Sequence, residues 1–272
     1  MKYKAVISDL DGTLLNSEHK ISEYTKGVIK DIISQGVKFI IATGRHHKDA
    51  LCFKKQLGAD SYLVSSNGAK VHDDENNIII SHNIPGNFTS KLLDVEVSDE
   101  IIRGVYAGDS WYTEKYTPEF AEYHVESGFV PEVIDFETLR GKEISKIFYI
   151  SDNTALLEEL EERLKSNKEF TEKLDITASL DKCLEVMVKE ATKGNAVKEI
   201  LEKEGISCNE AIAFGDGLND KEMLTVVGKG VVMGNASDKL KALLPDFEVI
   251  GTSSEDSEAH YLEKIYRWTT SF

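Results

Sequence analysis

Cysteine is scarce in this chain of 272 residues, which contains only three. Cys52, Cys183 and Cys208 are far apart in the sequence and odd in number, and no CxxC pair suggests a metal or redox role. We therefore expect buried or free thiols in a reducing cytoplasm.

Long apolar runs are also missing. No stretch approaches the roughly 20 apolar residues that a membrane-spanning helix needs. Residues 1–4 lead directly into an apolar strand and do not resemble a signal peptide. We expect a cytoplasmic protein that does not associate with membranes.

Positive charge is in short supply, with 32 Lys and Arg against 48 Asp and Glu and a net charge of −16. Nucleic-acid binding needs a basic face, so we expect no nucleic-acid partner. An anionic substrate would have to be captured by local cations and backbone donors, against an unfavourable overall field.

Apolar strands and amphipathic helices alternate in the first part of the chain. Such alternation favours a parallel sheet with helices on both faces. We expect a strand at 4–8, a helix at 22–35, a strand at 37–42, a helix at 47–57, a strand at 62–65 and a hairpin turn at 73–76.

The pattern changes near residues 85–86 and resumes at residue 193. Runs of period two in between indicate an α+β domain with an antiparallel sheet. The predicted fold is α/β, with a Rossmann-like, doubly wound parallel core formed by residues 1–83 and 189–272 and an inserted domain at residues 84–188. In the insertion we expect strands at 104–106, 111–114, 146–150 and 183–188 and a helix at 156–165.

The most informative run is VISDLDGTLL, residues 6–15, which places two carboxylates at the end of a buried strand. Asp9 and Asp11 have the same strand parity, and Gly12 permits the turn that ends the strand. Two close carboxylates repel each other unless a cation or a shared proton compensates, and Mg²⁺ prefers oxygen ligands. One carboxylate could attack while the other handles protons. The alternative is an ordinary strand followed by an Asp-Gly turn.

Two other turns carry groups suited to an anion. Thr43 and Gly44 end the apolar strand at 37–42, where a hydroxyl and free backbone N–H groups form an anion site. Lys193 precedes an expected helix at 196–204 and could direct its ammonium at phosphate. The alternatives are a common βα turn and a solvated surface lysine.

A third turn, residues 215–220, reads GDGLND after an expected strand at 211–216. Asp216 lies at the tip of this strand, as Asp9 does at its own. Asn219 and Asp220 lead into an expected helix at 221–227, where Asp220 could be an ordinary N-cap.

Taken together and in this order, these runs resemble the haloacid dehalogenase (HAD) superfamily of phosphotransferases. Residues 9–13 match its first motif, Thr43 with Gly44 the second, Lys193 the third, and residues 215–220 the fourth. The match to the superfamily motifs is specific and spans both ends of the chain.

Two further segments are similar to signatures of the Cof-type branch, whose members carry a large cap between the second and third motifs. They are SNGA at residues 66–69 and VMGNA at residues 232–236. Within this branch, residues 43–47 and 249–252 resemble the YigL-type sugar-phosphate and pyridoxal-phosphate phosphatases.

One segment departs from the Cof-type pattern. Many chains of this branch carry Gly-Val-Ala near the C-terminus, where residues 254–260 here read SEDSEAH. The departure touches none of the four motifs. It bears on the packing of the last helix and on the rim of the substrate site.

The resemblance implies a reaction. Asp9 would attack phosphorus and form an aspartyl-phosphate, and Asp11 would protonate the leaving oxygen and then deprotonate water. Mg²⁺ would be held by the Asp9 carboxylate, the Asp11 backbone carbonyl and Asp216.

The resemblance also implies how the phosphoryl group is bound. Its oxygens would contact Thr43, the Gly44 amide, Lys193 and Asn219. Asp220 would orient either Mg²⁺-bound water or the Lys193 side chain.

Other residues allow two interpretations. His46 and His47 follow the phosphate turn and could contact substrate, or they could be surface residues of a helix. Asn67 could lie near the phosphate or only turn the chain. Trp111, Tyr112 and Glu114 could form a recognition patch in the cap, or the aromatic pair could belong to its core.

We therefore expect a Mg²⁺-dependent cytoplasmic phosphatase, a monomer or a weak homo-oligomer, acting on small phosphorylated metabolites such as sugar phosphates or pyridoxal phosphate. A capped site favours molecules that fit under a closing lid over phosphoproteins. Two alternatives are a phosphosugar mutase with the same intermediate and a non-catalytic metabolite-binding regulatory protein. The intact set of Asp9, Asp11, Lys193 and Asp216 argues against the second.

Overall fold

The computed structural model describes residues 3–117, 126–180 and 182–267. The chain divides into two compact units, which are described separately below. The first consists of Met1–Arg45, Ala50–Ile80 and Thr192–Phe272, and the second of His46–Asp49 and Ser81–Ala191. The expected limits of the inserted domain, residues 84 and 188, stay a prediction.

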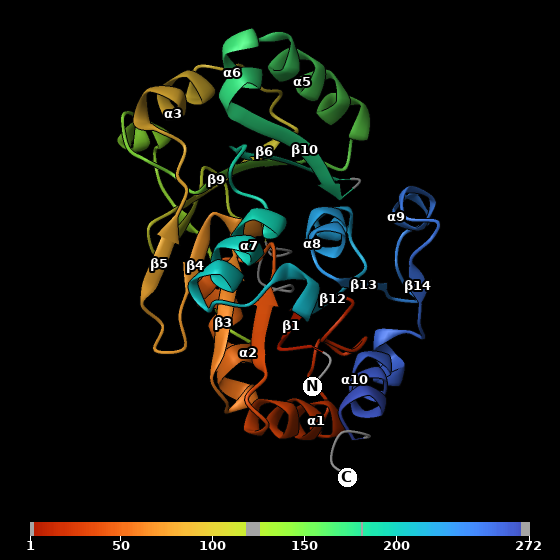
Figure 1. The fold of residues 1–272 in the computed structure, drawn as a ribbon. Coiled ribbons are helices and arrows are strands. Elements are labelled where there is room, and N and C mark those ends of the chain that lie inside the picture. The colour runs from red at the N-terminus through yellow and green to blue at the C-terminus, as the bar shows by residue number, and fades with distance from the viewer. Residues whose placement is uncertain (1–2, 118–125, 181, 268–272) are drawn as a thin grey trace. The chain divides into compact units, whose positions relative to one another are not determined.

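The first unit is built on an eight-stranded sheet with the order β14-β13-β12-β1-β2-β3-β4-β5 (Figure 1). The strands from β14 to β3 are parallel, which confirms the predicted α/β core. β4 is antiparallel to β3 because the four-residue connection between them, residues 66–69, is too short for a crossover. The strands are β1 (Ala5–Asp9), β2 (Lys38–Ala42), β3 (Ser61–Ser65), β4 (Lys70–His72), β5 (Ile78–Ser81), β12 (Ala211–Gly215), β13 (Lys229–Val232) and β14 (Glu248–Val249).

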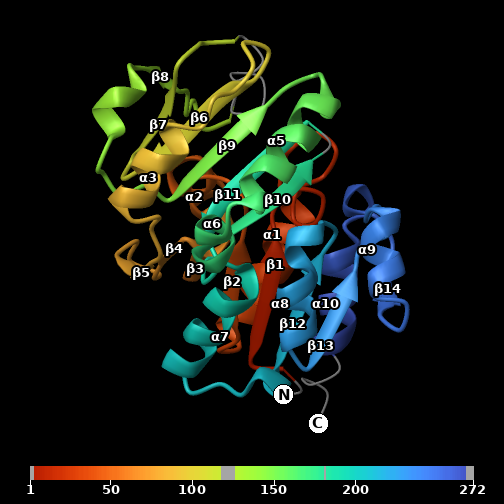
Figure 2. The same cartoon turned by 90° about the horizontal axis from the view of Figure 1, so that it is seen from above.

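Helices cover both faces of this sheet (Figures 1 and 2). Buried side chains of α1, α2 and α10 pack on one face, and those of α7, α8 and α9 pack on the other. These helices are α1 (Glu23–Ser34), α2 (His47–Leu57), α7 (Lys193–Lys203), α8 (Lys221–Val226), α9 (Asp238–Leu243) and α10 (Ser257–Arg267). The short 3₁₀ turns of this unit are η1 (Ser66–Gly68), η3 (Cys208–Glu210), η4 (Leu218–Asp220) and η5 (Ser253–Glu255).

The two-sided core follows from the apolar runs of the central strands. On β1, Val6 points to the face that carries Phe39 and Phe214, whereas Ile7 points to the face that carries Ile40. A strand that is buried on both faces reads as a continuous apolar run, which is why the sequence marks it clearly. Burial of both faces holds the carboxyl ends of β1, β2 and β12 in place.

One helix begins earlier than predicted. α7 starts at Lys193 and not at residue 196, because Thr192 caps it: the Thr192 hydroxyl accepts a hydrogen bond from the Asn195 amide at 3.1 Å. Lys193 therefore lies in the first turn of the helix, with a position set by helical geometry.

The second unit contains a six-stranded sheet with the order β10-β11-β9-β6-β7-β8, together with helical segments that are named below for its described residues (Figure 2). Its strands pair antiparallel except for β7 with β8, as the period-two runs indicate for most of the sheet. The strands are β6 (Ile102–Ala107), β7 (Ser110–Thr113), β8 (Glu132–Val133), β9 (Lys146–Ile150), β10 (Leu174–Leu180) and β11 (Cys183–Val188). The helical segments are α3 (Gly86–Leu93), η2 (Phe136–Leu139), α5 (Thr154–Ser166) and α6 (Lys168–Lys173).

None of the helices within the described ranges combines the length and the apolar character that crossing a bilayer requires. The cytoplasmic location and the monomeric or weakly oligomeric state stay predictions.

Candidate active site

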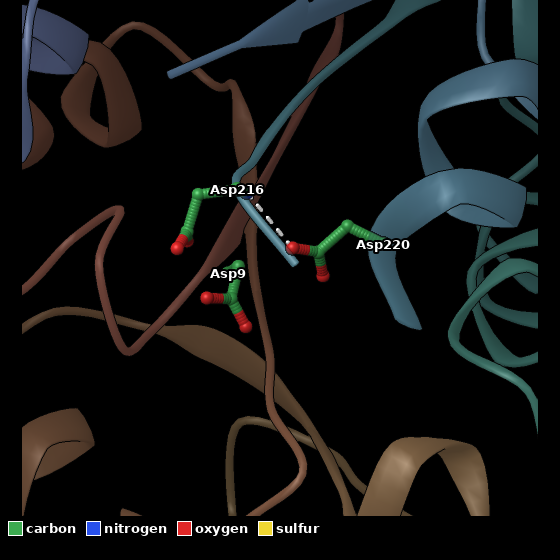
Figure 3. Close-up of side chains that lie close together, drawn as sticks. All are labelled: Asp9, Asp216 and Asp220. Carbon is green, nitrogen blue, oxygen red and sulfur yellow. Dashed lines mark hydrogen bonds between the residues drawn. The ribbon is translucent and has the colours of Figure 1, made fainter. Parts of the chain in front are cut away.

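Three carboxylates of the first unit meet at the carboxyl edge of its sheet. Asp9 is the last residue of β1, and Asp216 follows the neighbouring parallel strand β12. Asp220 ends the turn η4 and turns its carboxylate back toward the Asp216 main chain (Figure 3). Oxygen atoms of all three side chains lie within 4.8 Å of one another. Neighbouring parallel strands thus bring together residues that are about 200 positions apart in the sequence.

Lys193 is the cation of this cluster. Its side chain is fully buried, and its Nζ lies 2.5 Å from Asp9 Oδ1 and 2.6 Å from Asp220 Oδ1. The other oxygen of Asp220, Oδ2, accepts hydrogen bonds from the amides of Asp216 and Gly217 at 3.0 and 2.8 Å. Asp220 therefore anchors both Lys193 and the turn after β12, and a carboxylate is well suited to this because it only accepts.

The pKa values of the cluster are shifted by burial and by the close approach of its carboxylates. Burial and then the Asp220 charge raise the pKa of Asp9 well above its usual range, although Lys193 opposes this. Burial and the Asp220 charge also raise the pKa of Asp216, to about 6. Burial lowers the pKa of Lys193, but the Asp220 and Asp9 carboxylates outweigh it, so the net pKa is raised and the ammonium stays charged. One ammonium does not compensate three clustered carboxylates, two of them buried and Asp216 half-buried, which favours a further cation.

Gly12 leaves the space that Asp216 occupies. It has φ +80°, in the left-handed region, and a Cβ at this position would lie 2.4 Å from Asp216 Oδ2. The next residue, Thr13, donates its hydroxyl to Asp216 Oδ1 at 2.8 Å. The Asp-Gly-Thr run of the first motif thus both admits and orients the carboxylate of the fourth.

Asp11 is paired with Arg45, an interaction that the sequence analysis did not predict. Arg45 Nε lies 2.8 Å from Asp11 Oδ2, and Nη2 lies 2.6 Å from Asp11 Oδ1. The pair is bidentate, the geometry in which arginine binds carboxylates best. The Asp11 carboxylate is not part of the cluster of three, so its expected contribution to a metal site is its main-chain carbonyl.

Thr43, Gly44 and Asn219, three residues of the predicted phosphate site, lie close to Asn67, a predicted substrate contact. Thr43 is buried after β2 and accepts a hydrogen bond from the Arg45 amide at 3.1 Å. Asn219 donates its side-chain amide to Asn67 Oδ1 at 2.9 Å. A Cβ on Gly44 would lie 3.0 Å from the same oxygen, so Gly44 lets the turn approach Asn67 closely.

Asn67 itself has an unusual backbone. Its φ is 53°, and the φ of the preceding Ser66 is 46°, both in the left-handed region that non-glycine residues rarely adopt. Gly68 follows with φ +105°, and a Cβ there would lie 2.3 Å from the carbonyl oxygen of Thr192. Such strained loops persist only where their surroundings determine them, and this one brings the segment before α7 against η1.

The two histidines lie with residues of the second unit. His46 is 1% exposed, contacts the Gly108 carbonyl oxygen at 3.2 Å and stacks on Phe129. Burial lowers its pKa to about 3, so the ring is neutral. His47 contacts Asp109 Oδ1 at 3.1 Å. These contacts make both rings structural within this unit, and their contact with substrate stays a prediction.

The predicted patch of the cap has two kinds of environment. Trp111 is 3% exposed and packs with Tyr106 and Phe148, in the core of the second unit. Glu114 forms a bidentate pair with Arg103, at 2.7 and 2.6 Å. These contacts favour a structural role for both residues.

Asn235 is a further residue that sequence reasoning missed as part of the site. Its side-chain amide donates to the Gly12 carbonyl oxygen at 2.7 Å, and its Oδ1 accepts from the Ser253 amide at 2.9 Å. It lies in the run VMGNA, whose similarity to a family signature was the available signal. For Arg45 the signal was its place directly after Thr43 and Gly44.

Comparison with known proteins identifies the family of this chain. Residues 6–262 match the sequence profile of the haloacid dehalogenase-like hydrolases. A putative phosphatase of Buchnera aphidicola subsp. Baizongia pistaciae is 38% identical over 265 residues, covering 97% of this chain and 98% of the relative. An HMP-PP phosphatase of Serratia proteamaculans is 34% identical over 266 residues, covering 97% and 96%.

A solved structure from Bacteroides thetaiotaomicron, a haloacid dehalogenase-like hydrolase, is also similar. It superposes with a TM-score of 0.85 at 26% identity, over 97% of this chain and 100% of the other. The narrower resemblance to YigL-type enzymes stays a prediction. The chain therefore belongs to the haloacid dehalogenase-like hydrolases, and within that family it is a phosphatase.

Proposed function

We propose that the protein is a Mg²⁺-dependent phosphatase of small phosphorylated metabolites that works through an aspartyl-phosphate on Asp9. One observation carries this proposal. The Asp9 carboxylate lies at the carboxyl edge of the sheet, 2.5 Å from the buried Lys193 ammonium and beside Asp216. Ligands of open α/β sheets bind at this edge.

Asp9 is the group placed to attack. One of its carboxylate oxygens forms a bond to phosphorus while the bond from phosphorus to the leaving oxygen breaks. Both Asp9 and a phosphate monoester are anionic, so Lys193 must offset their repulsion. The Asp220 carboxylate holds the Lys193 ammonium from its other side and keeps it aimed at the reaction centre.

Asp11 is the acid and the base of the reaction. It gives a proton to the leaving oxygen in the first step, and in the second it takes a proton from the water that attacks the phosphoryl group and frees Asp9. Two N–H groups of the Arg45 guanidinium occupy the two carboxylate oxygens of Asp11, so neither oxygen is placed to donate to a leaving group in this arrangement. The pair must therefore open in each cycle.

The residues present fit a divalent cation. Both oxygens of Asp220 already accept hydrogen bonds, which leaves Asp9 and Asp216 as the carboxylates to hold Mg²⁺, with the Asp11 carbonyl as the third protein ligand. Burial, and after it the Asp220 charge, raises the pKa values of Asp9 and Asp216, and a bound cation would offset both effects. Mg²⁺ supplies positive charge that stabilises the transferring phosphoryl group.

The phosphoryl oxygens are held by donors around Asp9. These are the Thr43 hydroxyl, the Gly44 amide, the Lys193 ammonium and the Asn219 side-chain amide. The Asn67 contact fixes the orientation of the Asn219 amide, because Asn67 Oδ1 accepts one of its protons.

The substrate class rests on two considerations. The resemblance assigns the inserted segment as a cap, and a capped site favours small molecules. Several relatives are named HMP-PP phosphatases, so HMP-PP belongs in a substrate panel together with sugar phosphates and pyridoxal phosphate.

The test is phosphate release by the purified full chain from this panel, in the wild type and in Asp9→Asn. We expect Mg²⁺-dependent release by the wild type and a loss of at least about a thousandfold in the variant, with an unchanged circular dichroism spectrum. A mutase would interconvert sugar phosphates without net release, and a regulatory protein would bind without turnover. Appreciable turnover by Asp9→Asn would contradict the nucleophile assignment.

A further inference from the structure

A buried glutamate lies directly behind the Asp9 main chain. Glu258 is in the first turn of α10, within the segment that departs from the Cof-type pattern, and is 2% exposed. Its Oε2 lies 2.7 Å from Ser8 Oγ. Its Oε1 has no hydrogen-bond partner among the residues that the structure describes. A carboxyl group in this position is costly to ionise, since no cation of the described part of the chain forms an ion pair with it.

The hydrogen bonds around Ser8 fit only one protonation state of Glu258. Ser8 Oγ lies 2.7 Å from Glu258 Oε2 and also 2.7 Å from the main-chain oxygen of Asp9. The Ser8 hydroxyl has one proton, and the Asp9 carbonyl can only accept. An ionised Glu258 would therefore leave one of these two close oxygen pairs without a proton between them. A neutral acid satisfies both pairs, because Glu258 donates to Ser8 and Ser8 donates to Asp9.

Two environmental effects act on Glu258 in opposite directions. Burial raises its pKa to about 8, and a hydrogen bond donated by Ser8 to the ionised carboxylate would oppose this only in part. The first turn of a helix favours an anion, but this dipole effect is small compared with the cost of burying an unpaired carboxylate. The neutral acid is therefore the form expected near pH 7.

We propose that Glu258, as a neutral carboxylic acid, is a positioning residue for Asp9: it donates to Ser8 Oγ and so directs the Ser8 hydroxyl onto the Asp9 main-chain carbonyl. The proposal rests on the proposed role of Asp9 as nucleophile. The Asp9 carbonyl also accepts from the Leu14 amide at 3.2 Å. Two donors then fix the peptide at the end of β1, from which the attacking carboxylate projects.

The two hydrogen bonds from Glu258 to Ser8 and from Ser8 to the Asp9 carbonyl form a relay that links α10 to the proposed reaction centre. Glu258 and Ser8 are 250 positions apart in the sequence, and their contact joins α10 to β1. A small rotation of the Asp9 peptide would turn its carboxylate away from the direction of attack. Such a change slows the chemical step more than it weakens substrate binding. The effect of losing the relay should therefore fall on kcat and leave KM nearly unchanged.

The test compares Glu258→Gln with Glu258→Leu, which is similar in volume. The Gln side chain still donates to Ser8 Oγ, whereas the Leu side chain has no donor. We expect Glu258→Gln to keep kcat within about threefold and Glu258→Leu to lose about five- to tenfold, at an unchanged KM and with no fall in Tm. A wild-type kcat in Glu258→Leu, or equal losses in both variants, would overturn the proposal.

Two further measurements cover the case in which Glu258→Leu fails to fold. The infrared difference spectrum of wild type minus Glu258→Gln at pH 7 should contain the carbonyl stretch of a protonated carboxyl group, and its absence would refute a neutral Glu258. Ser8→Ala should slow turnover as Glu258→Leu does, and wild-type turnover in Ser8→Ala would refute the relay. Asp9→Asn, measured alongside, separates the two proposals, because its activity alone tests the nucleophile.

Discussion

Arg45 binds both carboxylate oxygens of Asp11, at 2.8 and 2.6 Å, so the proposed acid is held by a fork of two N–H donors. Arg45 directly follows the turn that carries Thr43 and Gly44, and β2 is the parallel neighbour of β1. The predicted phosphate-binding turn and the proposed proton donor are thus linked through Arg45. We expect a substrate that binds at this turn to disturb the Arg45–Asp11 pair.

Asp11→Asn should slow poor leaving groups more than good ones. A sugar alkoxide needs a proton as it departs, whereas nitrophenolate does not, so the loss should be about ten- to a hundredfold larger for a sugar phosphate than for nitrophenyl phosphate. The measurement is kcat/KM for both substrates. Burst kinetics serve as the control, because slow hydrolysis of the phosphoenzyme can mask the contrast. Equal losses in the phosphorylation step would contradict the general-acid role.

Gly12→Ala should destroy the site, and Gly36→Ala is its matched control. Both glycines have a left-handed φ, +80° and +86°, so each substitution costs about 1 kcal/mol of backbone strain. Only at Gly12 would the new Cβ collide with a carboxylate, that of Asp216, whereas Gly36 has open space around it. Both variants should lose stability, but only Gly12→Ala should lose the proposed Mg²⁺-dependent turnover and the rise in Tm that we expect on adding Mg²⁺. Full activity in Gly12→Ala would show that Asp216 does not need its present position.

The effect of Mg²⁺ on stability should depend on pH. Burial and Asp220 raise the pKa of Asp216 to about 6, so below that pH a proton competes with the metal for this carboxylate. The increase in Tm on adding Mg²⁺ should be larger at pH 7.5 than at pH 5. Differential scanning calorimetry checks this, with Asp216→Asn as the control that should show little increase at either pH. An equal increase at both pH values in the wild type would exclude Asp216 as a ligand.

Glu258 should make the folded state less stable as pH rises. Its pKa is about 8 in the folded protein against 4.5 for a free side chain, so between these values the folded state binds more protons than the unfolded state. Stability then falls with rising pH, by at most about 1.4 kcal/mol per pH unit from this group. Glu258→Gln does not titrate, so its Tm should exceed that of the wild type by a margin that grows from pH 5 to pH 8. A constant margin would show that Glu258 is already ionised at pH 5.

Strands and helices that leave a local pattern of apolar residues could be predicted from the sequence alone. The apolar runs before Asp9, Thr43 and Asp216 predicted β1, β2 and β12, because a strand buried on both faces leaves a continuous apolar pattern. The HAD-like α/β core and the phosphatase activity were predicted correctly, since both depend on short motifs at strand ends. The start of α7 was three residues too late, because its Thr192 cap lies before the apolar positions that mark the helix.

The contacts between side chains that are distant in the sequence depend on the tertiary structure. The Arg45–Asp11 pair, the Asn219–Asn67 contact and the Glu258–Ser8 hydrogen bond join residues that are 34, 152 and 250 positions apart. A local pattern shows that a residue is buried or exposed, but its partner depends on the order of the strands in the sheet and on the face that each helix covers. Glu258 is the clearest case. An acidic residue in a charged segment is expected to be exposed to solvent, but the packing of α10 against β1 buries Glu258 behind Asp9.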